Sequence, residues 1–199
     1  MDSVNHCVLC GSLVELPAFS HENHGREFYR FLLDVPRLSG VCDQLPVVAS
    51  REVLNTMELD GGSLLRVTGQ LRSFNNRSGV GRKLILSVYA DTIEVCEGEA
   101  ENDVTLAGAL CKAPILRRTP LGREICDVML AVPRRYHRTD YIPCILWGKT
   151  AREAAVMEAG ARLELHGRLQ SRTYLKTLED RTEERITYEL SAMDAFFLS

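Results

Sequence analysis

The residues in this sequence best suited to a chemical task are cationic and aromatic side chains that recur at alternate positions. From 165 to 174, one set of alternate residues is apolar or small, and the other set is His166, Arg168, Gln170, Arg172 and Tyr174. Successive side chains of a β-strand point to opposite faces, so each set shares one face. Arginines can contact phosphates, and a ring can stack on a nucleobase. The segment predicts a strand suited to binding nucleic acid, and it leaves open the alternative of a solvated outer face.

A second segment places two large rings on one face. Tyr141 and Trp147 have the same parity, whereas the other parity of this run is apolar: Ile142, Cys144 and Leu146. At a rise of ~3.3 Å per residue, the two rings would stand about 20 Å apart along a strand. With Arg138 and Lys149 beside them, they would form a track on which bases stack. The alternative for Trp147, the only tryptophan, is packing in the core or against the helix that follows.

Other side chains of the second half complete this candidate surface. The candidate phosphate contacts are Arg117, Arg118, Arg134, Arg135, Arg138, Lys149, Arg168, Arg172 and Lys176. The candidate stacking platforms, each worth ~1–3 kcal/mol when a base lies on it, are Tyr136, Tyr141, Trp147 and Tyr174. Residues 102–199 carry 15 lysines and arginines against 13 acidic residues, whereas residues 1–101 carry 9 against 14. A polyanion would therefore bind to the second half of the chain.

The elements that position these residues belong to a duplication. At an offset of 97 residues, Asn5, Leu9, Gly11, Leu13 and Pro17 recur as Asn102, Leu106, Gly108, Leu110 and Pro114. Gly25-Arg26-Glu27 recurs at the same offset as Gly122-Arg123-Glu124. Such a repeat indicates two copies of one structural unit. An acidic linker at 97–101 divides the chain into a first domain, 1–97, and a second domain, 102–199.

Each repeat contains short apolar or alternating runs punctuated by Gly and Pro, and a single helical segment. In the second repeat, Thr150 to Glu153 has the capping-box pattern, and the helix is expected to end by Gly160. In the first repeat, Ser50 to Met57 occupies the same place. Several strands and one helix within 97 residues favour a small closed barrel with a helix across its end. The expected fold is mainly β, with two tandem OB-fold barrels and one short helix in each.

The first repeat lacks the two rings of the second. At their positions it has Gln44 and Ser50, although the apolar residues between them are retained. An alternating run that ends at Arg72 and Phe74 still gives a partly cationic face. We expect a degenerate first barrel that binds weakly or serves mainly for assembly, with Arg72 and Phe74 as its candidate contacts.

Four segments of the second repeat also carry a family resemblance. Residues 102–108 (NDVTLAG), 118–122 (RTPLG), 140–149 (DYIPCILWGK) and 167–174 (GRLQSRTY) resemble bacterial single-stranded DNA-binding proteins, and the first repeat is similar but degenerate. The similarity covers nearly all of residues 102–199. It implies an OB-fold that binds single-stranded DNA with tolerance of sequence, in replication, repair and recombination, without catalysis. It places the family's stacking aromatics on Tyr141, Trp147 and Tyr174, with Tyr136 a looser match in a variable loop.

The resemblance also implies partners. The family usually works as a four-barrel assembly, which two barrels per chain would reach as a homodimer. Replication or repair proteins are candidate partners as well. The family commonly ends in a disordered stretch with an acidic tip that recruits such enzymes. Because this sequence ends at 195–199 (AFFLS), recruitment by that route is not expected.

Two other functions fit the same residues. One is an OB-fold scaffold for protein interactions within a replication or primosome complex, which the acidic first half and its weak aromatic face favour. The other is binding of single-stranded RNA, because stacking and phosphate contacts do not read the 2′-hydroxyl.

Catalysis and cofactors are not expected. No Ser/His/Asp or Cys/His set has supporting spacing, and no phosphate-cradling Gly-Lys-Ser/Thr sequence is present. Cys7 and Cys10 have the spacing of a metal knuckle, but residues three apart on a strand point to opposite faces, so no metal is expected. No apolar run approaches the ~20 residues that cross a bilayer, and the N-terminus does not resemble a signal peptide. We expect a cytoplasmic protein with reduced cysteines and no membrane contact.

Overall fold

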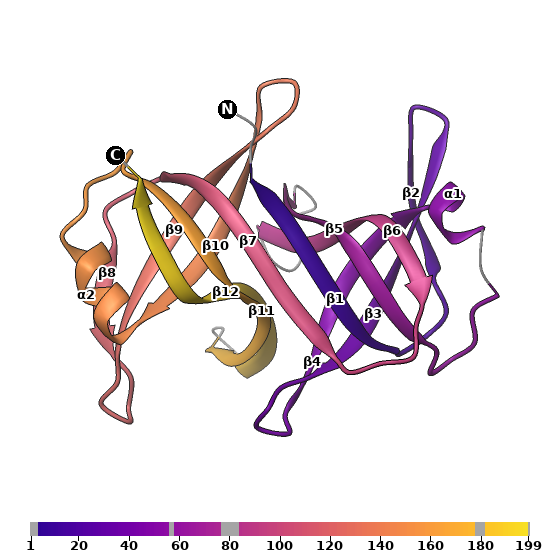
Figure 1. The fold of residues 1–199 in the computed structure, drawn as a ribbon, viewed down its shortest axis with the longest axis horizontal. Helices are drawn as coiled ribbons and strands as arrows, with labels where there is room; N and C mark the ends of the chain where they lie inside the picture. Colours follow the sequence, from indigo (N-terminus) through magenta and orange to yellow (C-terminus); the bar gives the residue numbers. More distant parts are fainter. Residues whose placement is uncertain (1–3, 56–57, 77–83, 178–181, 199) are drawn as a thin grey trace.

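The computed structural model describes residues 4–55, 58–76, 84–177 and 182–198, and most of them lie in β-strands (Figure 1). The strands of the first repeat are β1 (Asn5–Leu13), β2 (Ala18–Asn23), β3 (Arg26–Pro36), β4 (Cys42–Ser50), β5 (Leu64–Asn75) and β6 (Leu84–Val95). Those of the second are β7 (Glu101–Leu110), β8 (Ile115–Arg118), β9 (Glu124–Arg134), β10 (Arg138–Trp147), β11 (Arg162–Thr177) and β12 (Thr182–Leu198). Helix α1 (Arg51–Leu54) follows β4, and α2 (Gly148–Ala155) follows β10.

Strand pairing closes each repeat into a barrel. In the first repeat, β1 pairs with β5, β5 with β6, and β3 with both β2 and β4, all antiparallel. The barrel is closed by a parallel contact of β4 with β6, at Val47 and Val88, and by a short contact of β1 with β3. The second repeat closes in the same way, with β10 parallel to β12 at Cys144 and Leu190, and β7 against β9. The prediction of two tandem OB-fold barrels is therefore confirmed.

The alternation read from the sequence fills the barrel cores. In β11, Leu163, Leu165 and Leu169 are fully buried, and in β10 the same is true of Ile142 and Leu146. These strands are half-buried ribbons whose other face is available for polar and aromatic groups.

One glycine in each barrel allows a long strand to bend. Gly69 in β5 and Gly167 in β11 each lie next to a β-bulge. A Cβ at Gly167 would lie 2.1 Å from the carbonyl oxygen of Ser191, and a Cβ at Gly69 would lie equally close to that of Tyr89. The close approach of the two backbones thus requires glycine, which explains why this residue recurs in the repeat.

The helices are shorter than predicted. Helix α2 begins at Gly148, so Thr150 lies inside its first turn, where its hydroxyl donates to the carbonyl of Trp147 (2.9 Å). The capping-box prediction is wrong, because Gly148 adopts a left-handed φ of 54° and turns the chain directly after β10. Helix α2 ends before Gly160 and α1 ends at Leu54, and residues 56–57 of the predicted first helix lie outside the described residues. Within the described part of the chain, no helix has the length and apolar character needed to cross a membrane.

The two barrels are joined by their first strands. Strands β1 and β7 lie side by side and antiparallel at the centre of the molecule, so that one twelve-stranded sheet runs through both barrels (Figure 1). Asn5 lies opposite Leu106, and Leu9 lies opposite Asn102. Asn5 and Asn102 are repeat equivalents, as are Leu9 and Leu106, so the joint has the reciprocal pattern of a two-fold dimer interface.

Two buried carboxylates bridge the barrels on either side of this joint. Asp43 is fully buried, and it accepts hydrogen bonds from the amide (2.8 Å) and hydroxyl (2.7 Å) of Ser171. The guanidinium of Arg37 donates two more, each of 2.6 Å. Burial alone would raise the pKa of Asp43, but these hydrogen bonds outweigh it and hold the pKa below its usual range.

Asp140, the repeat equivalent of Asp43, makes the reciprocal contact less completely. It accepts a hydrogen bond from the amide of Ser73 (2.8 Å), and its carboxylate lies 3.3 Å from Arg134 and 3.5 Å from Arg72. Its Oδ2 atom has no hydrogen-bond partner among the described residues. The same buried position is thus held tightly on one side of the joint and loosely on the other.

Candidate nucleic-acid interface

Trp147 lies on the outside of the second barrel. It is the last residue of β10, its exposed fraction is 36%, and its Nε1 donates to the hydroxyl of Ser191 in β12 (3.0 Å). The preceding Leu146 is fully buried, so the alternation of the strand turns Trp147 outward. The hydrogen bond fixes the edge of the indole, and the exposed ring surface is open to a stacking partner. Packing of Trp147 in the core, one of the two alternatives that the sequence left open, does not occur.

An open hollow of about 690 Å³ lies beside this ring. Its lining includes three arginines, Arg118, Arg123 and Arg152, together with Glu124. Glu124 forms ion pairs with Arg118 (3.4 Å) and Arg152 (2.5 Å), and Arg152, as the strongest donor, lowers the pKa of Glu124. Because one carboxylate is shared by two of three guanidinium groups, the hollow keeps a net positive charge.

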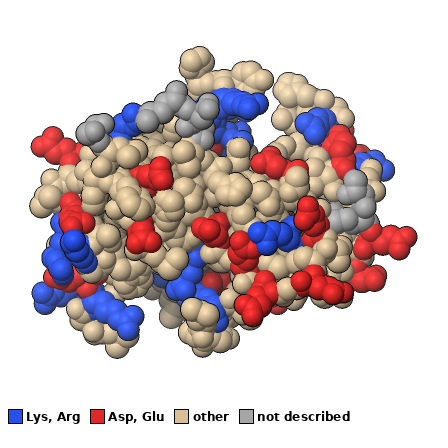
Figure 2. All heavy atoms as spheres, viewed as in Figure 1, with Lys and Arg blue, Asp and Glu red and all other residues tan. Residues whose placement is uncertain are grey.

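Two of these arginines, Arg123 and Arg152, are absent from the predicted site. Arg123 belongs to the Gly-Arg-Glu motif, whose recurrence marked the repeat, and Arg152 lies in α2. In Figure 2, lysine and arginine side chains gather at the end of the second barrel that carries β8 and α2. Only the fold brings the β8–β9 hairpin and α2 together at that end, so spacing along the sequence gave no signal for Arg152.

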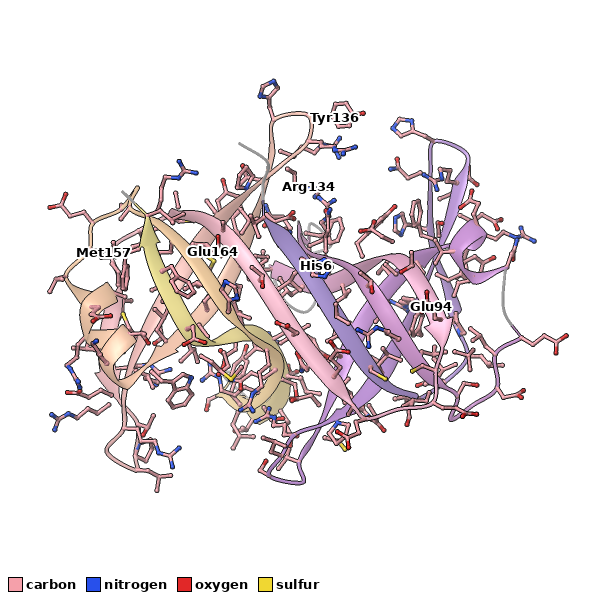
Figure 3. The ribbon with its side chains drawn as sticks, viewed as in Figure 1. His6, Glu94, Arg134, Tyr136, Met157 and Glu164 are labelled. Atoms are coloured by element: carbon pink, nitrogen blue, oxygen red, sulfur yellow. The ribbon has the colours of Figure 1, made fainter. Side chains whose placement is uncertain are left out.

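The predicted tyrosines do not line the hollow. Tyr136 is 90% exposed at the tip of the β9–β10 hairpin, where it and His137 adopt left-handed conformations (Figure 3). Tyr141 is 45% exposed near the start of β10, and its amide donates to the hydroxyl of Ser73 in the first barrel (2.7 Å). Tyr174 is 37% exposed in the β11–β12 hairpin. The rings therefore lie on separate elements and do not line one pocket.

The predicted phosphate contacts divide into two groups. Five of them are held in ion pairs: Arg117 with Asp127, Arg118 with Glu124, Arg134 with Asp140, Lys149 with Glu153 and Arg172 with Glu189. Arg135 and Arg138 are exposed and Arg168 is half-buried, and their side chains have no hydrogen bond or ion pair with any described residue. The side chain of Lys176 lies outside the described residues. The arginines most available to a phosphate thus flank Tyr136 and Tyr141.

In the first barrel, Arg72 occupies the joint and not an open face. Its Nη1 lies 3.5 Å from the buried Asp140, and its guanidinium lies 5.8 Å from the centre of the Tyr89 ring. Burial and the neighbouring Arg134 lower the pKa of Arg72. Phe74 is 42% exposed and lies opposite Ile85, which is 45% exposed. Its ring is therefore accessible, as a contact to nucleic acid requires.

The first barrel carries rings on β2, β3 and β6, although β4 has Gln44 and Ser50 at the positions of Tyr141 and Trp147. Phe28 lies opposite Ser50, stacks on His21 with ring centres 4.9 Å apart, and lies 5.8 Å from Tyr89. Phe28 is only 5% exposed, so the accessible rings of this group are His21 and Tyr89. We call His21, Phe28 and Tyr89 the first-barrel ring cluster. Arg30 is exposed on the same face of β3, and its side chain has no hydrogen bond or ion pair with a described residue.

Strand register explains why the sequence comparison missed this cluster. Val48 pairs with Tyr89 in the first barrel, and Ile145 pairs with Ser191 in the second. Tyr89 and Ser191 are therefore equivalent, at an offset of 102 residues and not 97. The first barrel places serine on β4 and a ring on β6, whereas the second places a ring on β10 and serine on β12.

Comparison with known proteins gives a consistent set of similarities. The family model described as the single-strand binding protein family matches residues 101–198. Single-stranded DNA-binding protein 3 of Clostridium acetobutylicum is 36% identical over 104 residues, which are 49% of this chain and 70% of that protein. Single-stranded DNA-binding protein B of Bacillus subtilis is 39% identical over 80 residues, which are 37% of this chain and 71% of that protein.

A solved structure extends the similarity of fold to both barrels. The wild-type single-stranded DNA binding protein from Thermus aquaticus superposes with a TM-score of 0.81 at 24% identity. The superposition covers 100% of this chain and 95% of that one. The arrangement of two barrels in one chain is thus a known architecture.

Proposed function

Because the chain belongs to the single-strand binding protein family, we propose that it binds single-stranded DNA with tolerance of base sequence and catalyses no reaction. The observation that carries the proposal is the half-exposed Trp147 ring beside a hollow lined by arginines. A ring anchored at its edge can stack on a base while guanidinium groups contact the flanking phosphates. Every base has a π-face and every nucleotide a phosphate, so such binding does not depend on sequence.

The bound DNA strand would run from the Trp147 hollow along β10 to the β9–β10 hairpin. Tyr141 and Tyr136 offer further stacking surfaces there, and the unpaired Arg135 and Arg138 offer phosphate contacts. Each phosphate neutralised releases counterions, so the logarithm of affinity should fall with the logarithm of salt concentration by ~0.7 per contact. The ion-paired arginines should contribute less, since a phosphate must first compete with their carboxylates.

Within the chain, the proposed division is a first domain of residues 1–97 and a second of residues 102–199. The second domain would carry the main binding face, because it holds Trp147 and the cationic hollow. The first-barrel ring cluster and Arg30 support a contribution from the first domain as well. The linker between the domains is short, and β1 and β7 pair directly, so one DNA strand would contact both domains of the same chain.

We further propose that the chain works as a homodimer of four barrels in the bacterial cytoplasm. The β1–β7 joint pairs two barrels within one chain, and two such chains would complete an assembly of four barrels. Size-exclusion chromatography with light scattering should give twice the mass of 22.3 kDa at micromolar concentration. A stable monomer under these conditions would contradict the proposal.

A second function, docking of a replication or repair protein, is favoured by the charge of the first barrel. Figure 2 shows acidic side chains spread over the face of that barrel. A basic partner would fit this surface. A pull-down that retains a stoichiometric protein after nuclease treatment would support docking.

The direct test of DNA binding is fluorescence anisotropy with labelled oligothymidine at two salt concentrations. Unlabelled oligothymidine should compete fully, and duplex DNA of the same length should compete weakly. Matched RNA oligomers serve as the third competitor. If RNA competes as well as DNA, the proposed ligand becomes single-stranded nucleic acid in general and not DNA alone. Absence of binding at low salt would refute the proposal and favour protein docking.

A further inference from the structure

Two thiols meet at the edge of the first barrel. The Sγ atoms of Cys10 and Cys96 are 3.2 Å apart, although 86 residues separate them in the sequence. Cys10 lies in β1, and Cys96 directly follows the last residue of β6, with its amide donating to the carbonyl of Leu64 (3.0 Å). Cys10 is 2% exposed and Cys96 is partly exposed.

The thiols lie where the first barrel meets the linker to the second. In the sheet, Cys10 pairs with Arg66 of β5 on one side and with Glu101 of β7 on the other. Arg66 and Glu101 form an ion pair across it. The DNA-binding proposal gives these cysteines no role.

We propose that Cys10 and Cys96 form a reversible disulfide, and that this site reacts with low-molecular-weight disulfides such as glutathione disulfide. The thiolate of Cys96 attacks one glutathione sulfur, forms a mixed disulfide and releases a first glutathione thiolate. Cys10 then attacks the Cys96 sulfur, closes the protein disulfide and releases the second glutathione. Two protein thiols and one glutathione disulfide thus give one protein disulfide and two glutathione thiols, which take up the two protons.

The geometry suits this order of reaction. A disulfide needs the sulfurs at ~2.05 Å, so they must approach by about one ångström. Cys10 is fixed in a strand, whereas Cys96 lies beyond the end of β6 and can make the adjustment. Burial, and then the contact with Cys96, raises the pKa of the Cys10 thiol to about 11. The more exposed Cys96 is therefore the thiol that meets the external disulfide first.

The second barrel shows that the pair is not required by the fold. The repeat equivalent of Cys10 is Ala107, and the strand register makes Leu198 the equivalent of Cys96. A disulfide from Cys10 to Cys96 would enclose nearly all of the first barrel and none of the second. Oxidation should therefore stabilise the first barrel selectively, because it restricts the unfolded chain.

The test is incubation of the folded full-length chain with glutathione disulfide, followed by acid quenching, alkylation and peptide mass spectrometry. The variants are Cys96→Ser and Cys10→Ala, the latter chosen because the second barrel has alanine there. Cys42→Ser, which removes an exposed cysteine outside the pair, is the matched control. Wild type and Cys42→Ser should give a Cys10–Cys96 cross-linked peptide that dithiothreitol removes, and Cys96→Ser and Cys10→Ala should not.

Thermal unfolding gives the second readout. Oxidation should raise the unfolding temperature of wild type and Cys42→Ser and leave that of Cys10→Ala unchanged. The proposal is overturned if glutathione stays on Cys96 as a mixed disulfide while Cys10 remains free. It is also overturned if only cysteines outside the pair react.

Discussion

The two barrels have the same strand register but place their large rings on different strands. In the second barrel Trp147 ends β10 and donates to Ser191 of β12, whereas in the first barrel Ser50 ends β4 and Tyr89 lies on β6. The outer faces also differ in charge, since Arg30 of the first barrel corresponds to Asp127 of the second. Duplicated barrels can thus conserve a core while each builds its outer face from a different strand.

The barrels also differ in how firmly they hold their shared joint. Asp43 has four short hydrogen bonds, whereas Asp140 has one short hydrogen bond, one of 3.5 Å from the Ser73 hydroxyl and two longer ion pairs. The joint is therefore reciprocal in sequence and unequal in strength.

The largest expected effect follows from this inequality. Asp43→Ala should lower the free energy of unfolding by ~3–5 kcal/mol, because the Ser171 amide loses its acceptor and the partly buried Arg37 guanidinium keeps only the Ser171 carbonyl as a partner. Asp140→Ala should cost less. Urea denaturation of both variants checks the order. An equal or larger loss for Asp140→Ala would mean that repulsion between Arg72 and Arg134 dominates the joint.

Acid titration is the control for the role of charge. The folded pKa of Asp43 is lowered, so its contribution to stability is present above the unfolded pKa of ~3.9 and is lost as pH falls through the folded value. The neutral variant Asp43→Asn should therefore lose less stability than wild type below about pH 4. Identical acid profiles would show that the charge of Asp43 does not hold the joint.

The next effect concerns the rings. Trp147→Ser and Tyr89→Ser each install the residue that the other barrel has at the equivalent position. Trp147→Ser should weaken binding of oligothymidine by ~2 kcal/mol, roughly 30-fold, and Tyr89→Ser by ~1 kcal/mol, roughly fivefold. Anisotropy titrations measure both, and circular dichroism confirms folding. A larger loss for Tyr89→Ser would make the first barrel the main binding face.

A smaller effect separates free from paired arginines. Arg30 has no partner among the described residues, whereas Arg117 is held by Asp127 through two hydrogen bonds. Arg30→Ala should reduce the slope of log affinity against log salt by ~0.7, and Arg117→Ala should leave it unchanged. If Arg117→Ala lowered the slope and Arg30→Ala did not, the DNA strand would lie over β8 and β9 and away from the first barrel.

The smallest effect is a gain. Glu124 neutralises part of the Trp147 hollow by pairing with Arg118 and Arg152. Glu124→Gln should release both guanidinium groups and strengthen binding about two- to fivefold, the scale of a surface ion pair. Salt-dependent anisotropy checks this, and weaker binding would show that Glu124 holds the arginines in a productive position.

The features that could be predicted from the sequence are those that depend on local patterns of residues. Alternation along β10 and β11 identified the core leucines, and the repeat of Asn5 and Asn102 indicated two barrels. Trp147 faces outward as predicted, because the parity of a strand determines the face of each residue. These features need only neighbours in the chain.

The rest depends on contacts between distant segments. The partner of Asp43 is Ser171, 128 residues away, and no local pattern points to it. Arg152 reaches the Trp147 hollow because α2 packs beside the β8–β9 hairpin. Tyr89 was missed because the hairpin lengths differ between the repeats, so a fixed offset does not align β6 with β12.

The most direct test of the central claim is a titration of wild-type protein with oligothymidine. The readout is the fluorescence of Trp147, the only tryptophan. Stacking of a base on the exposed indole predicts strong quenching that saturates with binding and reverses at high salt. Tight binding with unchanged tryptophan fluorescence would contradict the claim that the Trp147 hollow is the site of base stacking.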